Sequence, residues 1–320
     1  MFFSIIVPVY NRPKEIRELL ASLVHQSYKI FEVIIIEDGS DIRCKDIVED
    51  FESFLSLQYV YQENTGQGYA RNKGMKLAKG DYYILFDSDC VIPPQYLEIV
   101  LHHLLDRKLD AYGGPDQADK DFSPLQKAMN YSMTSMFTTG GIRGKLKDPS
   151  KYQARGYNMG ISKEVFLATE GFKDPNQAED IELSIRLKKM GFKLELIKEA
   201  FVFHKRRNTL NSFFKQSYSF GRNRVHVSRY HSDAIKVIHF LPLAFVIALL
   251  SLPLLYWLLP GLFSIAFILL MLWSLAVIIG SALENKSMYV GLLSLPVAFG
   301  QLFSYGVGLV TEGFKKLVYG

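Results

Sequence analysis

A long uncharged stretch constrains the fold of this chain more than any other feature. Between Val237 and Leu283 the sequence contains no Asp, Glu, Lys or Arg, although 22% of its 320 residues are charged. A membrane-spanning helix needs about 20 mainly apolar residues, so this stretch has room for two such helices. Pro260 and Gly261 interrupt its middle, which predicts one span over 238–258, a tight turn, and a second span over 262–283.

A third hydrophobic segment, over 288–310, is less apolar because it carries Ser, Gln and several Gly. Its composition is compatible with a span, a re-entrant segment or an interfacial helix. If it crossed the membrane, Lys315 and Lys316 would lie opposite the N-terminal part of the chain, against the positive-inside trend. We therefore expect residues 1–230 to form one domain and residues 231–320 a membrane region with two to three hydrophobic helices.

Basic residues are concentrated shortly before the first predicted span. This clustering predicts a multi-pass cell-membrane protein whose N-terminal domain lies on the cytoplasmic side. A nucleic-acid surface is the alternative, but the chain has no recognisable binding motif, so we expect no nucleic-acid partner. The cluster consists of Lys205, Arg206, Arg207, Lys215, Arg222, Arg224, Arg229 and Lys236.

Strand and helix patterns alternate through the N-terminal part, which predicts an α/β fold with a mainly parallel sheet and helices on both faces. Residues 1–10 have no basic leader and contain Pro8, so we interpret them as the first strand and not as a signal peptide. Cys44 and Cys90 are too few for a disulfide framework. We expect strands at 4–9, 31–37, 57–62, 82–86, 111–113 and 192–197, and helices at 14–26, 45–54, 69–79, 93–106 and 179–190.

Residues 117–157 show a less regular pattern. Glycines and basic residues in this region predict a mobile basic loop, which would be either a lid over phosphates or a solvated surface loop. These residues are Gly140, Gly141, Arg143, Gly144, Lys145 and Lys147.

Two carboxylates, Asp87 and Asp89, directly follow the apolar run 82–86. They therefore lie at the carboxyl end of a predicted strand, the edge at which open α/β sheets bind ligands. Two hard oxygen donors one residue apart suit a divalent cation that also carries phosphate. A solvated turn is the alternative interpretation of an isolated Asp-x-Asp pattern.

Seven short stretches stand in a characteristic order along the chain. They are Ser4-Ile5-Ile6-Val7-Pro8-Val9-Tyr10-Asn11, Val33-Ile34-Ile35-Ile36-Glu37-Asp38-Gly39-Ser40, Asn64 through Arg71-Asn72-Lys73-Gly74, Asp87-Ser88-Asp89, Asn158-Met159-Gly160, Gly171-Phe172 and Glu179-Asp180-Ile181-Glu182-Leu183. Together they resemble the family 2 glycosyltransferases over residues 3–224. The resemblance implies a nucleotide-binding sheet of the GT-A type, a nucleoside-diphosphate sugar as donor, Mg²⁺ or Mn²⁺ as cofactor, and inversion at the anomeric carbon.

The resemblance also implies roles on the donor side of the site. Asp38 would accept a hydrogen bond from the base, by analogy uracil, unless Asp38-Gly39 is a simple turn. Asp89 would ligate the metal directly, Asp87 would contact the ribose or the metal, and His204 would complete the metal shell or be structural. The expected donor-binding residues are Pro8, Tyr10, Asp38, Arg71, Asp87, Arg222 and Arg224. The alternatives are a helix-surface position for Arg71 and a membrane-apposed basic helix for Arg222 and Arg224.

On the acceptor side, the motif position makes Asp180 the expected catalytic base, which would take the proton of the attacking hydroxyl. Helix capping is the alternative role for this residue. Glu179 and Asn158 are expected to bind the acceptor. Gln216 with Arg222 and Arg224 resembles a loose form of the Q-x-x-R-W element of processive relatives, but the tryptophan is absent, which argues against processive polymerisation.

The expected function is therefore sugar transfer from a nucleoside diphosphate, most simply a UDP-linked one, to a hydroxyl of a lipid-linked glycan in polysaccharide or glycolipid biosynthesis. A first rival is transfer to polyprenyl phosphate, as in dolichol-phosphate mannose synthase, where the acceptor is already ionised. A second is nucleotidyl transfer, which releases diphosphate. A third is a non-catalytic membrane scaffold, which the set of carboxylates argues against.

Overall fold

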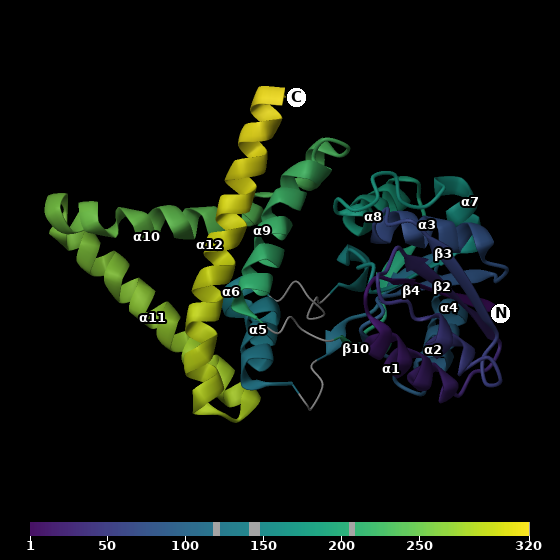
Figure 1. Cartoon of the computed structure of the whole chain (residues 1–320). Coiled ribbons are helices and arrows are strands. Elements are labelled where there is room, and N and C mark those ends of the chain that lie inside the picture. Colours follow the sequence, from purple (N-terminus) through teal and green to yellow (C-terminus); the bar gives the residue numbers. More distant parts are fainter. Residues whose placement is uncertain (118–121, 141–147, 205–208, 320) are drawn as a thin grey trace. The chain divides into compact units, whose positions relative to one another are not determined.

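The computed structural model describes the chain except for residues 118–121, 141–147, 205–208 and 320. The chain forms two compact units, each built from two segments of sequence (Figure 1). The first comprises Met1–Asp119 and Leu146–Lys205, and the second comprises Lys120–Lys145 and Arg206–Gly320. The sequence pattern placed residues 1–230 in one domain, whereas the structure groups residues 120–145 and 206–230 with the C-terminal helices.

The first unit is built on a seven-stranded sheet of order β3-β2-β1-β4-β8-β6-β9. All neighbouring strands pair in parallel except β8, which is antiparallel to both β4 and β6. The expected mainly parallel sheet is confirmed. Its strands are β1 Phe3–Val9, β2 Phe31–Asp38, β3 Leu57–Gln62, β4 Tyr82–Phe86, β6 Ala111–Gly113, β8 Asn158–Ser162 and β9 Leu194–Leu196.

Helices cover both faces of this sheet because its central strands are apolar on both sides. In β1, for example, Ile5 and Val7 point into one core while Ile6 points into the other. Residues of α1, α2 and α4 line the first core, and residues of α3, α7 and α8 line the second. The bounds are α1 Pro13–Val24, α2 Lys45–Glu49, α3 Gln67–Leu77, α4 Tyr96–Arg107, α7 Lys163–Thr169 and α8 Glu179–Lys189.

A second sheet of three short strands has the order β5-β10-β7. Its strands are β5 Cys90–Val91, β7 Asp116–Gln117 and β10 Val202–His204. In the antiparallel pair β5 and β10, His204 lies opposite Cys90. This register brings the end of the first unit's chain to the residues that directly follow the Asp-Ser-Asp sequence.

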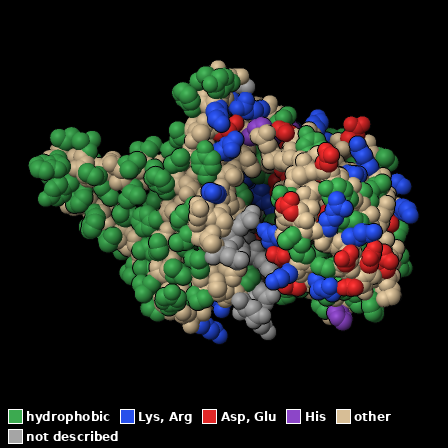
Figure 2. All heavy atoms as spheres, viewed as in Figure 1, with side chains coloured by type: hydrophobic (Ala, Val, Ile, Leu, Met, Phe, Trp, Pro, Cys, Tyr) green, Lys and Arg blue, Asp and Glu red, His purple; other side chains and the backbone are tan. Residues whose placement is uncertain are grey.

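The second unit is helical. Its helices are α5 Pro124–Thr134, α6 Met136–Thr139, α9 Leu210–Val227, α10 Leu241–Leu258, α11 Pro260–Asn285 and α12 Met288–Tyr319, with short 3₁₀ turns at Ser232–Ala234 and Val237–Phe240. The last three are long and apolar enough to cross a membrane. The tight turn expected near residue 260 is confirmed, since α10 ends at Leu258 and α11 begins at Pro260. Figure 2 shows that hydrophobic side chains dominate the visible surface of α10 and α11.

The loop expected over 117–157 is wrong in part, because this region contains α5, α6 and a 3₁₀ turn at Pro149–Lys151. A capping box begins α5. The Ser123 hydroxyl accepts a hydrogen bond from the backbone amide of Gln126, and the Gln126 side chain accepts one from Ser123 N. Pro124 occupies the first helical position. Ser-Pro-x-Gln is a recognisable helix start that the sequence interpretation overlooked. Most of the basic loop expected within this region, residues 141–147, lies outside the described residues.

Candidate active site

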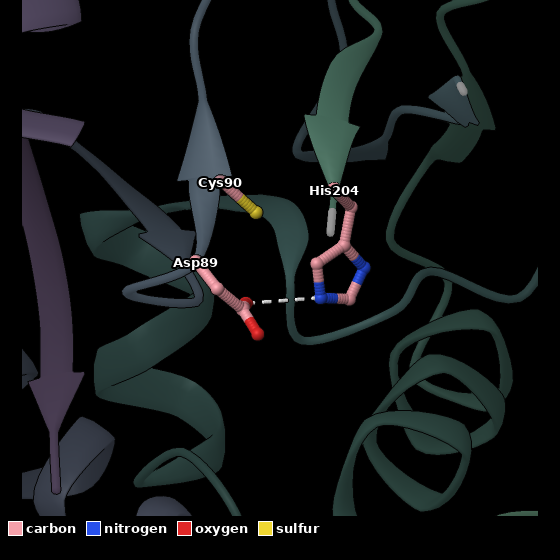
Figure 3. A group of neighbouring side chains, drawn as sticks. All are labelled: Asp89, Cys90 and His204. Carbon is pink, nitrogen blue, oxygen red and sulfur yellow. Dashed lines mark ion pairs between the residues drawn. The ribbon is translucent and has the colours of Figure 1, made fainter. Parts of the chain in front are cut away.

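Asp89 and His204 lie at the centre of a cluster of ionisable side chains at the carboxyl edge of β4. Their closest atoms, Asp89 Oδ1 and His204 Nε2, are 3.1 Å apart, and Asp87 Oδ2 lies 3.7 Å from the same nitrogen. Figure 3 shows Asp89 and Cys90 following one strand while His204 reaches toward them from β10. The β5–β10 register therefore brings His204 close to Asp87 and Asp89, which lie far from it in the sequence.

This cluster fits a divalent cation. The potential ligand atoms of Asp89, Cys90 and His204 all lie within 4.8 Å of one another. Burial raises the pKa of the Cys90 thiol, as do the charges of Asp87 and Asp89. Carboxylate oxygens also suit Mg²⁺ or Mn²⁺ better than a thiol does. Burial lowers the pKa of His204, but the hydrogen bond to Asp89 and the two aspartates raise it more. Asp89, Asp87 and His204, the three expected ligands, are thus brought together.

Arg71 joins the two halves of the candidate site. It is only 2% exposed, which excludes a helix-surface position. Its Nη2 donates to Asp87 Oδ1, and its Nη1 donates to Glu179 Oε1 at 3.2 Å. The residue lies in α3, and its contacts connect the metal side of the site to the start of α8. Its guanidinium therefore balances the charge of carboxylates on both sides.

Glu179 and Asp180 begin α8, but their environments differ. Glu179 is buried, and burial together with the charge of Asp180 raises its pKa, which Arg71 opposes. Asp180 is partly exposed, and its carboxylate accepts hydrogen bonds from Ile181 N at 2.7 Å and Gly156 N at 3.2 Å. The N-cap residue of α8 is Ala178, so Asp180 is not the N-cap itself. These contacts orient an accessible carboxylate beside Arg71.

Asp38 lies at the end of β2 and is 2% exposed. Its carboxylate accepts hydrogen bonds from Gln62, from Thr65 N at 3.0 Å and from Gly66 N at 2.8 Å. It therefore fixes the turn that leads into α3. Contact with a nucleotide base stays a prediction for this residue.

Pro8 and Tyr10 occupy the end of β1. Pro8 is buried and lies opposite Ile36 in the ladder, whereas the Tyr10 side chain is 50% exposed at the same sheet edge. Only Tyr10 is thus placed where it could contact a nucleotide directly. The binding roles of both residues stay predictions.

Asn158 is fully buried in β8. Its amide nitrogen donates to Ala200 O at 2.9 Å, and its amide oxygen accepts a hydrogen bond from Tyr96. These bonds tie β8 to neighbouring segments. The acceptor-binding role expected for Asn158 stays a prediction that its burial does not favour.

Arg222 and Arg224 belong to α9 in the second unit. Arg222 Nε donates to Glu312 Oε2 at 3.3 Å, so its guanidinium takes part in an ion pair within that unit. The donor-binding role expected for both arginines stays a prediction. Lys205, Arg206 and Arg207 of the basic cluster lie outside the described residues.

The sequence interpretation missed two residues at this edge. Arg12 Nη1 lies 3.4 Å from Asp89 Oδ2, and Glu37 is completely buried between Ser40 and the amide of Cys44. Ser40 in turn accepts a hydrogen bond from Asn11 N at 2.8 Å, which fastens the loop after β1 to the loop after β2. The position of Arg12, just beyond a strand end, was the available signal.

Residues 4–167 match the family model described as Glycosyl transferase family 2. The sequence is 39% identical over 99 residues to EpsH of Bacillus subtilis, a protein named as a glycosyltransferase, which covers 31% of this chain and 29% of the relative. It is 34% identical over 108 residues to the glycosyltransferase GlyA of Streptococcus pneumoniae, covering 33% and 16% of the two chains. The matched segments span less than a third of these relatives.

Solved structures show the fold. The mannosyltransferase PcManGT from Pyrobaculum calidifontis, in complex with GDP-Man and Mn²⁺, superposes with a TM-score of 0.67 at 17% identity, covering 93% of this chain and 86% of that one. Residues 1–349 of TarS from S. aureus give a TM-score of 0.54 at 18% identity, covering 100% and 93%. The expected GT-A type architecture is confirmed. From the family match together with this fold, the chain belongs to glycosyl transferase family 2.

Proposed function

We propose that this glycosyltransferase is a membrane-anchored, cation-dependent, inverting enzyme. It transfers a sugar from a nucleoside diphosphate to a hydroxyl of a lipid-linked glycan at the cytoplasmic membrane surface. One observation carries the proposal: Arg71 connects the Asp87–Asp89–His204 group to Glu179, next to Asp180. On this proposal, the donor phosphates and the acceptor hydroxyl use separate, adjacent sets of side chains.

The cation would be held by Asp89 and His204 with help from Asp87, and Mg²⁺ or Mn²⁺ suits such a set. When bound, it supplies positive charge that neutralises the departing nucleoside diphosphate. The Mn²⁺ and GDP-Man of PcManGT, and the UDP-GlcNAc complex of TarS, support a nucleotide sugar as donor.

Asp180 acts as the base. The acceptor oxygen forms a bond to the anomeric carbon while the bond from that carbon to the diphosphate oxygen breaks, and the hydroxyl proton moves to the Asp180 carboxylate. The amides of Ile181 and Gly156 hold this carboxylate in place. Glu179, paired with Arg71, keeps the arginine oriented toward Asp87.

The deciding experiment incubates membranes containing the full chain with a panel of nucleotide sugars and native lipid extract. We expect cation-dependent release of nucleoside diphosphate with sugar on a lipid-linked hydroxyl, and loss of both in Asp180→Asn. Release of diphosphate instead would identify a nucleotidyltransferase. Transfer to polyprenyl phosphate that survives Asp180→Asn would support the alternative acceptor. Absence of any cation-dependent stabilisation by nucleotides would indicate a scaffold.

A further inference from the structure

The three long apolar helices differ in their surroundings. α10 and α11 are exposed along almost their whole length, whereas α12 is far more buried and less hydrophobic. Two shorter polar helices, α5 and α9, cover the buried side of α12. An apolar helix that is exposed all round needs lipid all round, but a helix with polar neighbours does not fit that environment.

The contacts within the second unit arrange α10, α11 and α12 as the sides of a triangle (Figure 1). The first turns of α10, at Leu243 and Val246, touch α12 at Gly306. The last turns of α11, at Ser281, touch α12 at Ser294 through a 2.7 Å hydrogen bond between their hydroxyls. The α10–α11 turn is the corner away from α12.

These contacts have a topological consequence. If α10 and α11 cross the membrane as a hairpin, the start of α10 and the end of α11 lie on the same side. α12 lies beside the second half of α11, where Phe299 reaches Trp273 with 5.2 Å between the ring centroids, and then touches the start of α10 at Gly306. It therefore passes from the end of α11 to the start of α10, the two helix ends that lie on that side. With 18 residues α10 is about 27 Å long, close to the hydrocarbon thickness of about 30 Å. With 26 residues α11 is about 39 Å long and crosses with a tilt.

α9 gives independent support. It runs parallel to α12 from the contact of Phe214 with Gly300 to the hydrogen bond between Lys316 and Ser228. A spanning α12 would therefore carry α9 into the bilayer. Exposed Lys215, next to Phe214, would then lie near the bilayer centre, where an unpaired Lys is strongly disfavoured.

The outer side of α12 carries a stripe of exposed apolar side chains. Its residues recur every three or four positions apart from a gap between Leu292 and Phe303, where Phe299 on the same side packs against Phe245 and Trp273. This spacing is expected for one face of an amphipathic helix. The charged residues of α12 that flank this stripe near its C-terminal end are Lys315 and Lys316. The stripe consists of Tyr289, Leu292, Phe303, Val307, Val310, Phe314 and Leu317.

We propose that α12 is not a third span but an interfacial helix, which lies along the membrane surface at the base of the α10–α11 hairpin and inserts its apolar stripe into the lipid. Its partner is the lipid bilayer itself. This arrangement places Lys236, Lys286, Lys315 and Lys316 on one side of the membrane and leaves only the uncharged turn at Leu259 and Pro260 on the other. It also agrees with the positive-inside trend, which a third span would violate by placing Lys315 and Lys316 on the side opposite the N-terminal part of the chain.

Single-cysteine labelling of the full chain in sealed membrane vesicles tests the proposal. The native Cys44 and Cys90 are buried, so the unaltered chain provides the background for a membrane-impermeant maleimide. We expect Met288→Cys and Tyr319→Cys to react from the same side and Gly261→Cys to react from the opposite side. All three positions are exposed.

Labelling of Met288→Cys and Tyr319→Cys from opposite sides would overturn the proposal, because α12 would then span the bilayer. Labelling of Gly261→Cys from the same side as both would overturn it as well, because the hairpin would not cross. Tyr289→Cys and Val318→Cys form a second exposed pair in case the first variants do not accumulate. Neither labelling result depends on glycosyltransferase activity.

Depth measurement gives a second readout. Nitroxide labels attached at Phe303, Val310 and Leu317 should all be quenched from nearly the same shallow depth, since the three lie on one exposed stripe. A spanning helix would instead give a depth that changes steadily along the series, and that result would refute the interfacial arrangement.

Discussion

Arg71 Nη1 lies 3.2 Å from Glu179 Oε1 in the interior of the first unit, and both side chains are almost completely buried. The same guanidinium also pairs with Asp87, which is partly exposed. The buried Arg71 guanidinium thus pairs with two carboxylates that are far apart in the sequence. Removing it would leave Glu179 buried without its cationic partner.

The first prediction concerns the buried Arg71 side chain. Arg71→Met should lower the free energy of unfolding by about 3–5 kcal/mol, because a buried charge loses its partner. The matched control is Arg17→Met, which breaks the exposed pair between Arg17 and Asp50 and should cost about 1 kcal/mol or less. Thermal unfolding of the detergent-solubilised chains measures both. Equal losses in the two variants would contradict the bridging role of Arg71.

The second prediction separates chemistry from donor binding. Asp180→Asn should lower kcat by about 100- to 10,000-fold, the range that a general base contributes. Stabilisation by cation and nucleoside diphosphate should stay unchanged, since Asp180 contacts Ile181 and Gly156 rather than the Asp89 group. Turnover assays and thermal shifts on the same preparation provide the comparison. A parallel loss of nucleotide binding would show that Asp180 acts through the fold.

The third prediction concerns the cation site. Asp89→Asn and His204→Ala should each abolish the thermal stabilisation that Mn²⁺ and a nucleoside diphosphate give together, as chelation should in the unaltered chain. Asp46→Asn, a change at an exposed carboxylate on α2, is the control and should keep that stabilisation. If the stabilisation persists in both site variants, the cation binds elsewhere.

The fourth prediction tests the close packing of α9 on α12. A Cβ at Gly308 would meet the Tyr218 carbonyl oxygen at 2.1 Å, whereas a Cβ at Gly313 would meet nothing within 4 Å. Gly308→Leu should therefore force the helices apart and lower the unfolding temperature, while Gly313→Leu should change it little. Protease resistance of the solubilised chains reports the same difference. Equal behaviour of the two variants would refute the tight crossing.

The fifth prediction concerns the thiol of Cys44. Burial raises its pKa far above the ordinary value, and neighbouring Glu37 raises it further. The reactive thiolate is consequently scarce at pH 8, and maleimide should not modify Cys44 in the folded protein. Labelling followed by mass spectrometry, with urea-unfolded protein as the reactive control, checks this. Rapid labelling without denaturant would mean that the loop around Glu37 opens readily.

Local sequence patterns were sufficient to predict most of the strands and helices of the first unit. Continuous apolar runs identified β1, β2 and β4, and the position of Asp87 and Asp89 after β4 located the candidate site. Burial of Arg71 could not be predicted in this way, because it depends on Asp87 and Glu179 approaching α3 from two sides. Long-range pairing of this kind has no signature within one helix.

In the second unit, the sequence predicted the long apolar helices but not the shorter helices and ion pairs that pack against them. Composition predicted α10 and α11, whereas α5 was not predicted, because its apolar face is short and its partners in α9 and α12 are distant in the sequence. The pairing of Arg222 with Glu312 was equally invisible, since each residue alone fits a solvated position. The helix-start signal at Ser123 was present but was outweighed by the glycines that follow.

The chain passes between the two units three times, because residues 120–145 leave the first unit and return to it before the final passage near residue 205. A protein truncated after the first unit would retain α5 without the helices that cover Ala128, Met129 and Met133. Such a fragment would expose an apolar surface and aggregate. Anyone seeking a soluble catalytic fragment should therefore excise the α5–α6 excursion as well as the C-terminal helices.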